Sequence, residues 1–102
     1  KFNFCTATFG APMKKHLTII VTGKVQGVGF RRSAMSHAST MKVNGTVRNT
    51  SGGAVVMEVE GTEKALERFV EWCRNGPVMA KVDNVEVTDG LVIGHIGFNV
   101  AE

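Results

Sequence analysis

The chain has 102 residues, of which 43% are hydrophobic, and its formal net charge is +3. This length allows one domain, which can bury roughly 60–70% of the surface that its unfolded chain exposes. The composition is ordinary for a globular protein, no apolar run approaches the ~18 residues of a membrane span, and no secretory signal is evident, so we expect a cytoplasmic domain without a membrane partner.

The first twelve residues are expected to stand apart from the domain. Met13 followed by two lysines looks like a natural start. We interpret residues 1–12 as a disordered extension or a remnant of the expression vector, and residues 13–102 as the domain.

Local patterns then predict the elements of the first half. Residues 16–22 are apolar and β-branched, which indicates a buried strand. Residues 30–41 repeat apolar side chains at helical spacing, which predicts a helix with one apolar face. Val47 alternates with polar neighbours as in a strand, and residues 50–53 read Thr-Ser-Gly-Gly, a hairpin turn.

The second half repeats this order. Val55, Met57 and Val59 alternate with side chains expected on a solvent-exposed face, namely Val56, Glu58 and Glu60. Thr62 is a candidate N-cap for a helix that ends before Gly76 and Pro77. Strands are expected around residues 82–87 and 96–100. The order βαββαβ with one further short strand predicts an α+β, ferredoxin-like sandwich, in which two helices cover one face of an antiparallel sheet.

Residues 23–31 read Gly-Lys-Val-Gln-Gly-Val-Gly-Phe-Arg and join the first strand to the first helix. Gly27 and Gly29 allow positive φ, so that successive N–H groups can face one concavity beside the helix N-terminus. Arg31 adds a planar fork of donors. The loop therefore predicts a phosphate site formed by six residues, Gln26, Gly27, Val28, Gly29, Phe30 and Arg31.

Neither familiar nucleotide motif fits this loop. A P-loop would continue with Lys and Ser or Thr after the second glycine, and a dinucleotide fingerprint would need a small residue at position 32, where Arg32 stands. We therefore expect a small phosphate compound rather than a nucleotide. Inorganic phosphate or sulfate should bind as a site ligand.

Charge is distributed unevenly along the chain. Three early lysines account for the net charge, and the nine basic residues after them balance nine acidic ones, which argues against nucleic acid as a partner. The first acidic residue is Glu58, so the half that holds the loop has no carboxylate to neutralise it. Its positive field would attract a small anion. The basic residues of this half are Lys24, Arg31, Arg32, Lys42 and Arg48.

The string at residues 23–31 resembles the motif of the acylphosphatase family, and so does the later Gly45-Thr46-Val47-Arg48-Asn49. The resemblance runs from about residue 17 to 50 and continues more loosely to residue 100. Two departures concern packing and capping: the family often has an aromatic at the place of Thr46 and a glycine at that of Lys42. The resemblance implies hydrolysis of acyl phosphates by direct water attack, with Arg31 holding the phosphate and Asn49 positioning the water.

Other interpretations remain for the same residues. Asn49 before a Ser-Gly-Gly turn is also commonplace as structure. The fold could instead serve as a non-catalytic phosphate or carbamoyl-phosphate binding module, once attached to a larger enzyme. RNA recognition would need exposed aromatics on the central strands, and a metal chaperone would need a Cys-x-x-Cys; neither is present.

No cofactor is expected. Residues 16–57 contain no carboxylate and only two separated histidines, so the loop has no set of ligands for Mg²⁺ or Zn²⁺. His16, His37 and His95 are expected to be surface or core histidines, and Cys73 a buried free thiol. We expect a monomer that works without metal.

Overall fold

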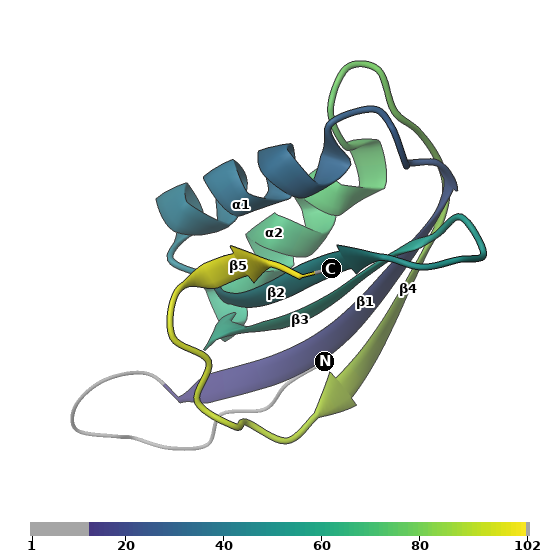
Figure 1. Ribbon diagram of the computed structural model, residues 1–102. Helices are drawn as coiled ribbons and strands as arrows, with labels where there is room; N and C mark the ends of the chain where they lie inside the picture. Colours follow the sequence, from purple (N-terminus) through teal and green to yellow (C-terminus); the bar gives the residue numbers. More distant parts are fainter. Residues whose placement is uncertain (1–12, 102) are drawn as a thin grey trace.

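The computed structural model describes residues 13–101, and residues 1–12, interpreted above as an extension, lie outside this part. Five strands and two helices follow in the expected order (Figure 1). They are β1 (Lys14–Lys24), α1 (Phe30–Met41), β2 (Asn44–Asn49), β3 (Val55–Thr62), α2 (Glu63–Asn75), β4 (Lys81–Gly90) and β5 (Phe98–Val100). Neither helix is long and apolar enough to cross a membrane.

The strands form one sheet in the order β4-β1-β3-β2-β5. The four long strands are antiparallel to their neighbours, as expected, and the further short strand, β5, runs parallel to β2, which makes the sheet mixed at this edge. After β4 the chain crosses from one edge of the sheet to the other (Figure 1). β4 ends at the end of the sheet where β2 begins, and β5 starts at that same end. The two strands β5 and β2 therefore run in the same direction.

Both helices cover one face of the sheet, as expected (Figure 1). Alternate residues of the central strands point toward them, and Ile19, Met57 and Val47 have no exposed surface. From the helices, Phe30 and Phe69 fill the space between the layers, and both are at most 1% exposed. Burying one such aromatic side chain stabilises the fold by about 1.5–3 kcal/mol.

The opposite face of the sheet departs from the expected pattern near its end. Glu60 was expected to face solvent, but it is only 2% exposed because the β4–β5 connection, residues 91–97, lies against it. Ile96 was expected in the last strand. It lies instead within this connection and is 89% exposed.

The register of the sheet brings the loop and the β2–β3 hairpin together. Val55, the first residue of β3, pairs with Val21 of β1 on one side and with Asn49 of β2 on the other. Two strand spacings, about 10 Å, therefore separate Asn49 from Val21, which lies three residues before the end of the strand that leads into the loop. Residues far apart in sequence meet at one end of the sheet.

Gly45 offers a test of this register. A Cβ there would run into the carbonyl oxygen of Glu58 on the neighbouring strand, and its φ is +149°. Gly53, in the hairpin turn, also has positive φ, +95°, but open space around it. Gly45→Ala should lower the free energy of unfolding by about 3 kcal/mol or more, and the matched Gly53→Ala by only about 1 kcal/mol. Urea titration measures both, and equal losses would contradict the packing described for β2 and β3.

Candidate functional site

The loop between β1 and α1 has the predicted conformation. Gly27 and Gly29 both have positive φ, +75° and +79°, and a Cβ at either would meet nothing within 4 Å. The glycines are therefore needed for backbone conformation rather than for space. Val25, 1% exposed, fixes the start of the loop in the core. Between these points the backbone turns sharply toward the first turn of α1.

The N-terminus of α1 is open to an anion. Its N-cap is Gly29, which has no side chain to accept a hydrogen bond, and no acidic residue lies in the first turn. The first N–H groups of a helix have no partner inside it. Arg31 and Arg32 stand in this turn instead, where each positive charge opposes the helix dipole by typically 0.3–1 kcal/mol. A bound anion would reverse this unfavourable arrangement.

Asn49 lies on the helix-facing side of β2, at the strand's last position. Its Oδ1 atom is buried and has no hydrogen-bond partner in the described chain. Leaving a buried acceptor unpaired costs about 1–3 kcal/mol. Such a group is costly as structure, but it is suited to receive a hydrogen bond from a molecule that enters the site.

Gln26 has a role that the sequence did not suggest. Its Nε2 donates to the carbonyl oxygens of Thr50 and Ala54, at 2.8 and 2.9 Å. These two residues begin and end the hairpin turn that follows Asn49. The side chain thus ties the loop to the hairpin and holds Asn49 beside the helix N-terminus.

These groups surround one pocket of about 530 Å³. Arg31 and Asn49, predicted as catalytic, both line it, together with Gly27, Gly29 and Phe30 of the predicted phosphate loop. Gln26 and Val28 do not: Gln26 is the tether, and Val28 packs against the core. No acidic side chain lines the pocket, and neither arginine forms a hydrogen bond or ion pair within residues 13–101. Its remaining lining residues are Val25, Arg32, Met35 and Val100.

Comparison with known proteins decides the family. The acylphosphatase family model matches residues 17–100. The chain belongs to the acylphosphatase family. An acylphosphatase of Nocardioides sp. is 43% identical over 88 residues, which is 86% of this chain and 89% of the relative. The domain is thus an enzyme, one that hydrolyses the carboxyl–phosphate bond of acyl phosphates.

Solved structures agree with this acylphosphatase assignment. The crystal structure of acylphosphatase from Bacillus subtilis superposes with a TM-score of 0.84 at 40% identity, covering 88% of this chain and all of that one. A similar domain also occurs inside a larger protein. Full-length HypF, in a phosphate- and nucleotide-bound form, matches with a TM-score of 0.85 at 31% identity, covering 91% of this chain but 12% of that chain.

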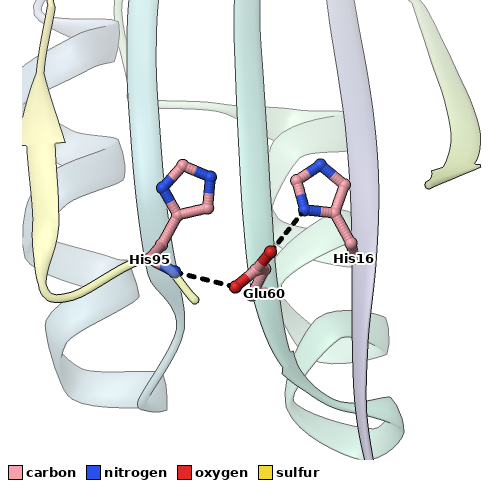
Figure 2. Close-up of side chains that lie close together, drawn as sticks. All are labelled: His16, Glu60 and His95. Carbon is pink, nitrogen blue, oxygen red and sulfur yellow. Dashed lines mark hydrogen bonds and ion pairs between the residues drawn. The ribbon is translucent and has the colours of Figure 1, made fainter. Parts of the chain in front are cut away.

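A second polar cluster lies on the face of the sheet that the helices do not cover, at the end away from the pocket. Figure 2 shows three of its residues, His16, Glu60 and His95. Glu60 accepts hydrogen bonds from the backbone N–H groups of Ile93, Gly94 and His95 at 2.7–3.0 Å. It also bonds Nδ1 of His16 at 2.7 Å, and Glu58 bonds the other ring nitrogen at 2.7 Å. His16, expected to be a surface or core histidine, is buried, with 7% of its surface exposed. Its two partners are more than 40 residues away in sequence, and no local pattern indicated them.

His16, Glu60 and His95 could in principle hold a metal ion, since their ligand atoms lie within 4.8 Å of one another. Yet both oxygens of Glu60 already accept two hydrogen bonds each. The cluster fastens the β4–β5 connection across the sheet. His16 also lies eight residues before the end of β1, about 26 Å from the loop, so the cluster is remote from the pocket.

Stability should depend on pH through this cluster. Burial alone would raise the pKa of Glu60, but its four hydrogen bonds outweigh it and lower the pKa from 4.5 to about 2. Burial alone would lower the pKa of His16, but its bonds to Glu60 and Glu58 and the charges of these residues raise it above 6.5. Glu60 therefore stabilises the fold above pH 4.5, and His16 stabilises it below pH 6.5.

We expect the free energy of unfolding to fall as pH drops from 4.5 toward 2, by up to about 3 kcal/mol from Glu60. It should also fall as pH rises through the raised pKa of His16. Glu60→Gln should remove most of the acid-side dependence, while Glu67→Gln, on an exposed part of α2, should leave it. Urea titrations at several pH values measure this; parallel curves for wild type and Glu60→Gln would contradict it.

Proposed function

We propose that the pocket beside the loop carries out the hydrolysis, with Arg31 and the loop amides holding the phosphoryl group and Asn49 orienting the attacking water. The observation that carries this proposal is the meeting of three features in one pocket: a helix N-terminus without a side-chain cap, and an arginine and an amide oxygen that have no partner among residues 13–101. Each can bind part of a phosphoryl group or a water molecule, and none is needed to hold the others in place.

The substrate has the form R–CO–O–PO₃²⁻. The oxygen of water attacks phosphorus in line, the bond from phosphorus to the acyl oxygen breaks, and a carboxylate leaves with the bonding electrons. The proton of water passes to the phosphoryl oxygens, so the products are a carboxylate and inorganic phosphate. Because the carboxylate is a good leaving group, positioning and charge stabilisation suffice and no strong base is required. Small acyl phosphates such as acetyl phosphate fit this description.

The site should work without metal, and inorganic phosphate should occupy it as a ligand. Arg31, the helix N-terminus and the loop amides supply positive charge before substrate arrives. We further propose that the protein is a monomer that binds neither nucleic acid nor membranes. A cytoplasmic location is in keeping with the free buried thiol of Cys73. Sedimentation analysis and cell fractionation test these two points, and a stable dimer or an exported protein would contradict them.

A binding module without catalysis is the alternative interpretation, and membership of the acylphosphatase family disfavours it. Its support is the similar domain that forms 12% of full-length HypF, a structure described as phosphate- and nucleotide-bound. Release of phosphate from acetyl or benzoyl phosphate by the purified chain separates the two. A module that only binds would retain acyl phosphate without turnover.

Arg31→Lys should lower kcat/KM at least about a hundredfold, and Arg31→Ala should do the same. A lysine keeps the charge but cannot form two parallel hydrogen bonds to phosphoryl oxygens. Arg48→Lys, on an exposed position of β2, is the matched control and should keep activity. If Arg31→Lys kept wild-type kcat/KM, the anchor would have to be Arg32 or Lys24.

Asn49→Ala should lose turnover about a hundredfold and yet bind inorganic phosphate within about twofold of wild type, because Asn49 is assigned to water rather than to the phosphoryl group. Calorimetry gives the affinity and a phosphate-release assay the rate. Loss of phosphate affinity together with turnover would assign Asn49 to binding instead.

Exhaustive EDTA treatment should leave hydrolysis intact, since the positive charge of the site comes from the protein itself. Phosphate or sulfate should inhibit competitively, and high salt should raise KM by screening the pocket. Activity that vanished in chelator and returned with a divalent cation would overturn the metal-free mechanism while leaving the substrate class standing.

A further inference from the structure

The pocket is lined by more than the groups assigned above to the phosphoryl group and the water, which are Gly27, Gly29, Arg31 and Asn49. Its lining also includes Met35 of α1 and Val100 of β5, each 38% exposed. This part presents hydrocarbon and has to accommodate the acyl portion of the substrate.

One charged side chain interrupts this apolar wall. Arg32 lines the same pocket, is exposed, and has no hydrogen bond or ion pair within the described residues. On the helix surface, Met35 stands four residues from Arg31 and three from Arg32, so it is a neighbour of both. An acyl chain that leaves the phosphoryl group at Arg31 and follows Met35 therefore passes Arg32.

The electrostatics around Arg32 favour an anion there. Its charge lies in the first turn of α1, at the positive end of the helix dipole, and no carboxylate lines the pocket to neutralise it. Arg31 is committed to the phosphoryl group in the proposed function. Arg32 is thus a second cationic group in the same pocket, next to Met35 on the helix surface.

Resting on that proposed function, we propose that Arg32 is a specificity-determining residue that binds a second anionic group on the acyl chain. The preferred substrates would be acyl phosphates that end in a carboxylate or phosphate, with the intervening carbons against Met35 and Val100. The bond changes at phosphorus stay the same. Arg32 affects which acyl group is accepted rather than the chemical step.

The test compares two substrates that differ only in the terminal group, succinyl phosphate and butyryl phosphate, both with four carbons. Wild type should show a higher kcat/KM for succinyl phosphate, by about tenfold. Arg32→Gln should remove this preference by lowering the value for succinyl phosphate and leave butyryl phosphate within about twofold. Arg48→Gln removes the same charge from an exposed position outside the pocket, and should change neither.

Several results would overturn the proposal: an equal loss on both substrates in Arg32→Gln, no loss on either, or a wild-type preference for butyryl phosphate. Turnover of butyryl phosphate reports on the proposed function separately. If wild type hydrolysed neither substrate, the proposed function would fail, and calorimetry with the corresponding non-hydrolysable acyl phosphonates would still decide the role of Arg32. Binding that ignores the terminal carboxylate, or a preference unchanged in Arg32→Gln, would rule that role out.

Discussion

The register of three neighbouring strands is the constraint on which the site depends. Val21, Val55 and Asn49 stand in one row across β1, β3 and β2. Side chains alternate between faces, so a slip of one residue in β2 would turn Asn49 away from the helix N-terminus. Val47, which lies two residues before Asn49 in β2 and is fully buried, makes such a slip costly, because the slip would also move Val47 out of the core. Core packing and the placement of Asn49 are thus enforced by the same contacts.

Several groups that line the pocket lower the stability of the folded domain. Two arginines share the positive end of α1, the N-cap has no side chain, and the buried amide oxygen of Asn49 lacks a partner within the part of the chain that the structure describes. Each arrangement is unfavourable by an amount that the rest of a small domain must offset. The rigid surroundings, including the two hydrogen bonds of Gln26, keep these groups in place. Positive charge is therefore already arranged at the pocket, and the binding of an anion proposed above would need little reorganisation.

Much of this could be predicted from the sequence because it is local. The bounds of α1 follow from the spacing of Phe30, Ala34 and Ala38, and the turn of the loop follows from its two glycines. The pairing of Arg31 with Asn49 in one pocket came from a resemblance in motif, since nothing in either segment indicates the other.

What the sequence did not reveal is non-local. Glu60 reads as one of several alternating polar residues of a strand, and only the crossing of residues 91–97 buries it. The parallel pairing of β5 has the same origin, because three residues carry too weak a strand signal to show direction. From the sequence alone, the side chain of Gln26 could have bound phosphate as readily as the hairpin. Its hydrogen bonds to Thr50 and Ala54 could not be predicted, because these residues lie far from it in the sequence.

The crossing between β4 and β5 has a consequence for synthesis on the ribosome. β5 pairs only with β2, an edge that exists once the β2–β3 hairpin has joined β1. Chains emerge from the N-terminus, so the loop, α1 and the hairpin can assemble while residues 91–100 are still being translated. Among the residues that line the pocket, Val100 is translated after all the others. A nascent chain would thus form the side of the pocket made by the loop and α1 before the side to which β5 contributes.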